Sequence, residues 1–362
     1  MKLPTEKNPF AVAGPIEFTK LEVADRDLYL KYYNRNPIYI SDICFNSRIA
    51  WNGGFNYHKA VIADTLVVVA YDDRFTDFHF AAPVGLHGST DLQAIIDVLW
   101  DPYAALSAVL PRKENLQNYR YITTGENGEF CELPVPTLAQ EEIPGADKGN
   151  SPFLRFMFVD ETQLSYFTNL KGYRTEVYYN PDYSDYFYDG EKMRTLAGKA
   201  LHAKRNHLTQ FMNDHPNAVY APLQASDGPD AVLLSRVSAL AAGKDPDNIK
   251  QGDSPAIAAF FAAFPQLLTR GGTIRENGEL LAFAAYSQNG DDCVFCHFEK
   301  AAVGHEDAYV AINALTLRNE FPNVRFVNRE EDIGLPHLRK AKMSYHPLKK
   351  INKYEVWIYR LR

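Results

Sequence analysis

Apolar positions in the second half of the chain follow a pattern that predicts an antiparallel sheet. Two apolar runs, 273–275 and 280–286, flank the dipeptide Asn277-Gly278. Asn-Gly between strand-like runs is the strongest short-range hairpin signal, because both turn residues tolerate a positive φ. A further apolar run at 293–298 predicts a third strand beside the hairpin.

Helical periodicity is clearest in the first half. Leu92, Ile95, Ile96 and Leu99 recur at the spacing of one helix face, which predicts a helix over 91–110. Proline and glycine are frequent in 134–152, so we expect a loop there. The same patterns predict further helices at 25–34, 161–170, 191–213, 230–242, 254–268, 308–321 and 335–345, and strands at 57–62, 65–71, 78–84, 153–159, 173–179, 218–222, 324–328 and 353–359.

This alternation of helices and strands predicts an α/β fold class in which mixed, mostly antiparallel sheets are flanked by helices. The sequence contains no exact repeat, yet each half runs through a similar order of elements. We therefore predict two related units in tandem, an N-terminal one at 1–180 and a C-terminal one at 181–362. The second unit is expected to carry the active site.

Composition narrows the class of protein. With 46% hydrophobic and 13% aromatic residues, the chain can bury a large core, which argues against a disordered protein. Its longest apolar stretches, 66–70 and 256–264, are far short of the ~20 residues that cross a bilayer. Residues 1–18 lack the charged-then-apolar pattern of a signal sequence, so we expect a cytoplasmic protein. Four scattered cysteines indicate reduced thiols, and the single CxxC predicts no zinc site.

Charge is unevenly distributed. The net charge is −7, but 317–362 contains eleven Lys and Arg against five acids, and 192–207 contains five Lys and Arg and no acid. These two segments sum to +11, which leaves −18 for the other 300 residues. Two basic segments in an acidic chain indicate an anionic ligand at a defined place, although solvated helix faces give the same pattern.

One stretch carries a family resemblance. It reads Asn328-Arg-Glu-Glu-Asp-Ile-Gly-Leu-Pro-His-Leu-Arg-Lys-Ala-Lys-Met-Ser-Tyr-His-Pro347, and it is accompanied by Gly198-Lys-Ala-Leu-His-Ala-Lys-Arg-Asn206 and Phe298-Glu-Lys-Ala301. With the order of elements, it resembles the phosphatidylglycerol lysyltransferase C-terminal domain family (DUF2156-like). The resemblance implies two GNAT (acyl-CoA N-acyltransferase) folds in tandem.

The same resemblance implies a function. Members move an acyl or aminoacyl group onto a hydroxyl or amine, and the best-known ones take an aminoacyl group from a charged tRNA and give it to a lipid. Those lysyltransferases carry a long membrane-spanning part that is missing from this sequence. We therefore expect at most peripheral contact with a membrane, and the acceptor stays open between a lipid and another small molecule.

Two residues are candidates for catalysis. Tyr345 lies at the end of the last predicted helix, where similar GNAT enzymes place a tyrosine that protonates the leaving group. Glu299 follows the predicted strand 293–298, where a carboxylate can accept the proton of the attacking group. A packed aromatic side chain is the alternative for Tyr345, and an ion pair with Lys300 or a nearby arginine is the alternative for Glu299. We interpret His297 as a packed histidine.

Basic side chains and a glycine supply candidate contacts to the donor's phosphates. Acyl-CoA enzymes bind pyrophosphate with a glycine-rich loop, and the corresponding segment 300–308 keeps only its glycine and carries Glu306 and Asp307, which repel phosphate. For any single lysine, an exposed helix surface is the alternative role. The candidates are Lys300, Gly304, Arg329, Arg339, Lys342, Lys199, Lys204 and Arg205.

These observations favour a transferase with aminoacyl-tRNA as donor and tRNA as partner. The alternatives are an acyl-CoA-dependent N-acyltransferase and a non-catalytic binding protein on a GNAT scaffold. We predict no required cofactor. We also predict no metal site, because the acids of 329–332 alternate in direction and have a neighbouring arginine, which favours ion pairs. P-loop, GxGxxG, GxSxG and HExxH motifs are missing from the sequence, which argues against the enzyme classes that depend on them.

Overall fold

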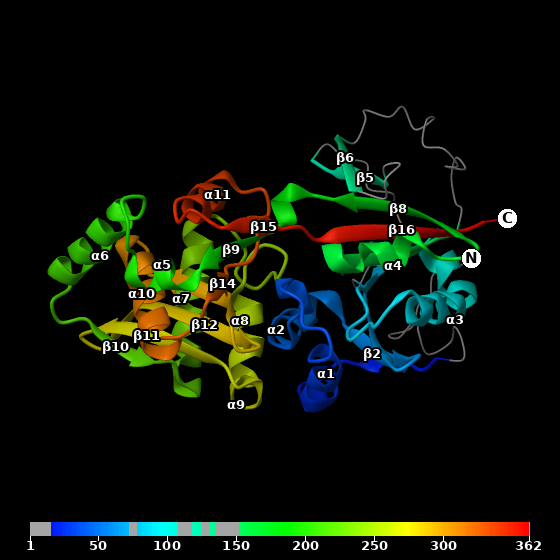
Figure 1. Ribbon diagram of the computed structural model, residues 1–362. Helices are drawn as coiled ribbons and strands as arrows, with labels where there is room; N and C mark the ends of the chain where they lie inside the picture. The colour runs from blue at the N-terminus through cyan, green and yellow to red at the C-terminus, as the bar shows by residue number, and fades with distance from the viewer. Residues whose placement is uncertain (1–15, 72–77, 108–117, 125–129, 135–151, 362) are drawn as a thin grey trace. The chain divides into compact units, whose positions relative to one another are not determined.

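The computed structural model describes residues 16–71, 78–107, 118–124, 130–134 and 152–361, and it divides into two compact units (Figure 1). The main division lies between Ser184 and Asp185. Two segments cross that boundary in sequence: 44–54 belongs to the second unit, and 352–362 belongs to the first. The second exchange arises because the last strand pairs with strands of the first sheet.

The first unit is built on a nine-stranded sheet with the order β1-β2-β3-β4-β7-β16-β8-β5-β6. Its strands are β1 (Thr19–Lys20), β2 (His58–Ile62), β3 (Thr65–Tyr71), β4 (Phe78–Ala81), β5 (Arg120–Thr124), β6 (Phe130–Pro134), β7 (Leu154–Val159), β8 (Tyr173–Tyr179) and β16 (Tyr354–Arg360). Its helices are α1 (Arg26–Tyr33), α3 (Ser89–Ser107) and α4 (Leu164–Thr168).

The second unit is built on a seven-stranded sheet with the order β10-β11-β12-β13-β14-β9-β15. Its strands are β9 (Asp185–Asp189), β10 (Val219–Pro222), β11 (Arg270–Glu276), β12 (Glu279–Asn289), β13 (Cys293–Ala301), β14 (Phe326–Asn328) and β15 (Lys349–Ile351). Its helices are α2 (Phe45–Phe55), α5 (Gly190–Thr195), α6 (His202–Asp214), α7 (Gly228–Ala241), α8 (Ser254–Ala262), α9 (Phe264–Leu267), α10 (Asp307–Glu320) and α11 (Pro336–Met343).

Helices cover both faces of the second sheet, which explains the unbroken apolar run of β12. Ala282, Ala284 and Tyr286 belong to the core in which α10 is embedded. Phe283 lies between them in sequence and packs its ring against Phe261 of α8, with the ring centroids 6.2 Å apart. Since successive side chains of a strand point to opposite faces, a strand buried on both faces is apolar throughout.

The strand pair that positions the site is β13 and β14. They run parallel and pair over three residues, from Cys293 opposite Phe326 to Phe295 opposite Asn328. Beyond Phe295, β13 continues to Ala301, whereas β14 ends at Asn328. The two strands therefore diverge, and the residues of β13 after 295 face the segment that follows β14. The first sheet contains one comparable parallel pair among its described strands, β4 and β7.

Most predicted elements are confirmed, and the differences have local causes. The predicted helix 191–213 is two helices, because Leu196 takes a left-handed conformation (φ +54°) after α5 and Gly198 takes another (φ +91°). The predicted helix 254–268 is likewise divided into α8 and α9 at Ala263. Part of the predicted loop 134–152 and the end of the predicted helix 91–110 lie outside the described residues.

Long apolar helices are missing from the part of the chain that the structure describes. No helix there is both long and apolar enough to cross a membrane.

Candidate active site

A buried carboxylate and a buried guanidinium meet where β13 and β14 diverge. Glu299 lies on β13, and Arg329 is the first residue after β14. Arg329 Nη2 donates to Glu299 Oε1 at 2.6 Å, and the two side chains are only 11% and 8% exposed. On the other oxygen, Asn313 Nδ2 of α10 donates to Glu299 Oε2 at 2.7 Å. Both carboxylate oxygens are therefore held by donors from different elements.

A β-bulge sets the direction of Glu299. In the pairing of β12 with β13, Ala285 lies opposite Phe298 and Tyr286 lies opposite Cys296, so His297 is the extra residue. The bulge lets Cys296 and Glu299 share a face although they are three residues apart, and the Cys296 thiol lies 3.8 Å from Glu299 Oε2. His297 points elsewhere, toward Ser287 and Glu330.

Tyr345 lies against this ion pair. It follows α11 by two residues, is 6% exposed, and packs edge-on against the Tyr188 ring of β9. The guanidinium carbon of Arg329 lies 4.7 Å from the Tyr345 ring centroid, and Lys204 Nζ of α6 lies 4.3 Å from it. Two cations thus contact one aromatic ring, an arrangement that adds cation–π attraction to their charge interactions.

Burial and charge shift the protonation of these groups in definite directions. Burial raises the pKa of the Tyr345 hydroxyl, and Glu299 adds to the effect, so the phenol keeps its proton near neutral pH. Burial lowers the pKa of Lys204, and the nearby Arg329 charge lowers it further. Burial opposes the charge of Arg329, but Glu299 outweighs it and the net shift raises the arginine pKa. Arg329 therefore remains charged.

The segment after β14 is fixed by backbone contacts as well. Arg329 N donates to Tyr186 O of β9 at 3.0 Å, and Lys342 Nζ of α11 donates to Arg329 O at 2.6 Å. Lys342 also donates to the carbonyl of Glu331. Lys342 thus positions the loop that carries Arg329, and its ammonium is occupied by carbonyl oxygens.

Several other residues that we predicted to bind the phosphates of the donor substrate have partners within the protein. Lys300 pairs with Asp253 at 2.6 Å, and Arg205 donates to the carbonyls of Leu196 and Gly198, which ends α5. Arg339 donates through Nε and Nη2 to the two oxygens of Asp332. The structure therefore brings Tyr345, Glu299, Arg329 and Lys204 together, but it places Lys300, Arg205 and Arg339 in separate contacts.

Two further candidates lie on exposed segments. Lys199 is exposed in the turn between α5 and α6. Gly304 has φ +87°, a left-handed conformation that favours glycine, although a Cβ there would meet no atom within 4 Å. At the start of α10, three residues further on, the Asp307 carboxylate pairs with His207 at 2.6 Å. An acidic side chain this close to Gly304 repels phosphate, which argues against a pyrophosphate-binding loop here.

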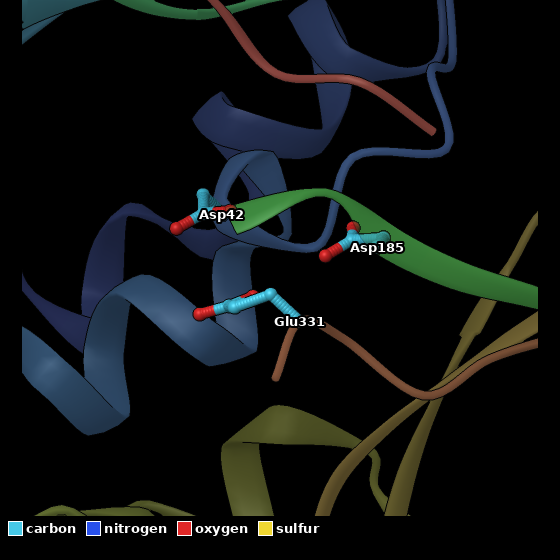
Figure 2. A group of neighbouring side chains, drawn as sticks. All are labelled: Asp42, Asp185 and Glu331. Carbon is cyan, nitrogen blue, oxygen red and sulfur yellow. The ribbon is translucent and has the colours of Figure 1, made fainter. Parts of the chain in front are cut away.

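Asp332, one of the acids of 329–332, forms an ion pair with Arg339, whereas the neighbouring Arg329 pairs with Glu299. Asp332 is fully buried and accepts from Arg339 at 2.9 Å through each oxygen, while the Tyr186 hydroxyl donates to Oδ2 at 2.5 Å. Two of the three acidic side chains in Figure 2, Asp185 and Glu331, belong to the second unit. The Asp185 carboxylate accepts from Asn328 Nδ2 at 2.9 Å, which ties β9 to the end of β14.

We expect Asp332→Asn to lower the free energy of unfolding by about 3 kcal/mol at pH 7, because it leaves Arg339 and Tyr186 with a neutral partner. Burial raises the pKa of Asp332, but hydrogen bonds from Arg339 and Tyr186 lower it more, to about 2 from 3.8. A depressed folded-state pKa stabilises the protein above pH 3.8, and this contribution of about 2 kcal/mol is lost as the pH falls toward 2.

Urea unfolding at several pH values measures this effect. The wild type should lose stability between about pH 5 and pH 2 more steeply than the variant does. Asp247→Asn is the matched control, since Asp247 is 72% exposed and pairs with the half-exposed Arg236, so we expect it to leave the stability nearly unchanged. Equal acid sensitivity of wild type and Asp332→Asn would contradict the assignment.

The sequence analysis missed two members of the site, Asn313 and Tyr188. Asn313 is a polar residue within the buried face of α10, and it donates to Tyr286 OH at 2.9 Å as well as to Glu299. Tyr188 lies on β9, a strand that the apolar pattern did not predict. A fully buried asparagine among apolar helix positions is the one signal that was available, because buried amides need hydrogen-bond partners.

The chain matches a known family over more than half of its length. A profile of the family described as phosphatidylglycerol lysyltransferase, C-terminal, matches residues 147–356. This range contains every residue of the cluster described above. The resemblance inferred from the sequence is thereby confirmed. No curated protein matches the chain.

Solved structures share the fold at low sequence identity. A conserved protein of unknown function from Bacteroides thetaiotaomicron VPI-5482 is 22% identical, with a TM-score of 0.74 over 94% of this chain and 99% of that chain. The C-terminal domain (DUF2156) of a putative lysylphosphatidylglycerol synthetase from Agrobacterium fabrum is 12% identical, with a TM-score of 0.54 over 93% and 92%. FemX is 6% identical, with a TM-score of 0.54 over 95% and 97%. The predicted class of two GNAT-like α/β units is confirmed.

Proposed function

The chain belongs to the phosphatidylglycerol lysyltransferase C-terminal family, and on this basis we propose that it moves an aminoacyl group from a charged tRNA to a hydroxyl or amine acceptor. One observation carries the proposal: the Glu299 carboxylate, two cations and the buried Tyr345 phenol meet where β13 and β14 diverge. Acyl transfer needs a proton acceptor, an electrostatic stabiliser and a proton donor, and these groups supply all three.

In this proposal Glu299 is the proton acceptor. Arg329 and Asn313 donate to its two oxygens, which fixes the direction of the carboxylate. As the acceptor's oxygen or nitrogen bonds to the ester carbonyl carbon, its proton passes to Glu299. The carbonyl oxygen gains the negative charge, and Arg329 and Lys204 stabilise it.

Tyr345 then protonates the leaving group. When the tetrahedral intermediate collapses, the bond between the carbonyl carbon and the ribose oxygen of tRNA breaks, and the oxygen leaves as an alkoxide. An alkoxide is basic enough to take the proton of a phenol whose pKa is raised by burial. The proton on Glu299 restores Tyr345, so one proton moves in total from the acceptor to the leaving oxygen.

Binding and transfer assays together test the proposal. Fluorescent charged tRNA is titrated with the purified full chain over a salt series, with CoA as competitor. Radiolabelled aminoacyl-tRNA is then mixed with the protein and with phosphatidylglycerol vesicles or small hydroxyl and amine compounds. We expect a micromolar Kd or tighter, a log–log salt slope of several units, and label in an acceptor.

The other outcomes point to the alternatives. Absence of tRNA binding at low salt, or displacement by CoA alone, would overturn the tRNA donor and favour an acyl-CoA enzyme. Binding without transfer to any acceptor would favour a non-catalytic binding protein on the same scaffold.

Lys199 offers a direct test of a phosphate contact. We expect Lys199→Gln to weaken tRNA binding and to reduce the log–log salt slope by about one unit, because each neutralised phosphate releases about one counterion. Lys244→Gln is the matched control, since Lys244 is also an exposed lysine of the second unit but follows α7. Equal slopes in the two variants would remove Lys199 from the tRNA interface.

A further inference from the structure

The bulged residue His297 is the centre of a buried hydrogen-bond chain on the face of β13 opposite Glu299. Its Nδ1 lies 3.1 Å from Glu330 Oε1, and its Nε2 lies 2.7 Å from Ser287 Oγ of β12. The His297 side chain is 2% exposed. Asn46 of α2 completes the chain by donating to Ser287 Oγ at 2.6 Å.

The direction of these hydrogen bonds follows from their donors. Because Asn46 donates to Ser287, the serine hydroxyl is free to donate its own proton to His297 Nε2. With Nε2 as the acceptor, Nδ1 is the ring nitrogen that donates to Glu330. One imidazole therefore contacts Ser287 and Glu330 at once.

Glu330 needs such a partner because its backbone is strained. Its φ is +56°, a left-handed conformation that costs a residue with a Cβ about 1 kcal/mol. Asn328 Oδ1 accepts from Glu330 N at 2.7 Å, and Tyr186 N donates to Glu330 O at 3.1 Å. The side-chain bond from Glu330 to His297 thus adds a contact between this turn and β13.

Arg329 and Glu330, which are consecutive in the turn after β14, contact β13 on opposite faces. Arg329 reaches Glu299 on one face, and Glu330 reaches His297 on the other. The bulge makes this possible, because Glu299 and His297 are two residues apart and would share a face in a regular strand. A change in the Glu330 turn therefore moves the neighbouring Arg329 as well.

We propose that His297 is a positioning residue, which through its hydrogen bond to Glu330 fixes the turn that holds the Arg329 guanidinium against Glu299. This inference rests on the proposed function for its kinetic consequence only. The chain of Ser287, His297 and Glu330 has the order of a nucleophile, a base and an orienting acid. Ser287 is only 5% exposed and already accepts from Asn46, which favours positioning over nucleophilic attack.

Two substitutions of His297 separate its two hydrogen bonds. His297→Asn places an amide near the position of Nδ1 and keeps a donor for Glu330, whereas His297→Gln reaches the position of Nε2 and keeps the contact with Ser287. Glu330→Ala removes the acceptor. We expect His297→Gln and Glu330→Ala to lower the kcat of aminoacyl transfer at least 10-fold with the Kd for charged tRNA within 2-fold, and His297→Asn to stay within 3-fold of wild type. Glu279→Gln, the loss of an exposed acid, is the control.

A second measurement needs no activity, so it separates this inference from the proposed function. Side-chain NMR of ¹⁵N-arginine protein, with the Arg329 signal assigned by Arg329→Lys, reports how firmly the guanidinium is held. We expect His297→Gln and Glu330→Ala to shift or broaden this signal, and His297→Asn to preserve it. An unchanged Arg329 signal in Glu330→Ala would overturn the inference, as would equal losses of signal and stability in both His297 variants.

Discussion

Glu299→Gln is expected to lower the single-turnover rate of aminoacyl transfer about 10³-fold, within the range of general acid–base effects. The amide has nearly the shape of the carboxylate but cannot accept the acceptor's proton. It also leaves the buried Arg329 charge without its ion-pair partner, which disturbs the group that stabilises the carbonyl oxygen. The measurement is rapid mixing of radiolabelled aminoacyl-tRNA with excess protein and acceptor.

Two controls make this prediction decisive. Glu279→Gln removes an exposed carboxylate of the same unit and should leave the rate unchanged. The Kd for charged tRNA should change by less than about threefold in Glu299→Gln, because the carboxylate acts on the acceptor's proton. A rate within tenfold of wild type, in a protein that still unfolds cooperatively, would exclude Glu299 as the base.

Tyr345→Phe has the second largest expected effect, a loss of turnover of about 10²-fold or more with donor affinity unchanged. The substitution keeps the ring against Arg329 and Lys204 and removes only the hydroxyl, so packing and cation–π contacts remain. Without a proton donor, the ribose oxygen must leave as a free alkoxide. Steady-state kcat and the tRNA Kd are the quantities to measure.

A tyrosine far from the cluster provides the comparison. Tyr183 is 47% exposed in the first unit, and Tyr183→Phe should leave kcat unchanged. Unchanged turnover in Tyr345→Phe as well would assign Tyr345 to packing alone. Rescue of a slow Tyr345→Phe enzyme by an ester with a more acidic leaving alcohol would support the role as proton donor, since such a group leaves without protonation.

The elements of the fold were predictable where a local pattern determines them. The Asn277-Gly278 turn and the apolar runs beside it locate β11 and β12. Both signals come from residues that are adjacent in the sequence. Strand β9 was not predicted, since its tyrosines and aspartates are stabilised by contacts with β14 and β15 from distant parts of the chain. The break after α5 depends on a left-handed Leu196, which apolar periodicity does not register.

Two residues of the candidate site, Glu299 and Tyr345, could be predicted from the sequence for similar reasons. Glu299 and Tyr345 stand at the ends of predicted elements, where strand and helix patterns stop and functional side chains gather. The sequence could not show which lysines and arginines lie beside Glu299 and Tyr345, because this depends on tertiary contacts. Lys300 pairs with Asp253, and Arg339 pairs with Asp332. No local sequence pattern predicts either pair. Lys204 lies at the site and Arg205, its neighbour, caps α5.

The position of β16 between β7 and β8 has a consequence for biosynthesis. Of the nine strands in the first sheet, this central one is the last to leave the ribosome, after the whole of the second unit's sheet has been made. Until then β7 and β8 have unpaired edges that invite misassociation. The first sheet of a nascent chain therefore stays incomplete, with these two edges open, until residues 354–360 have been synthesised.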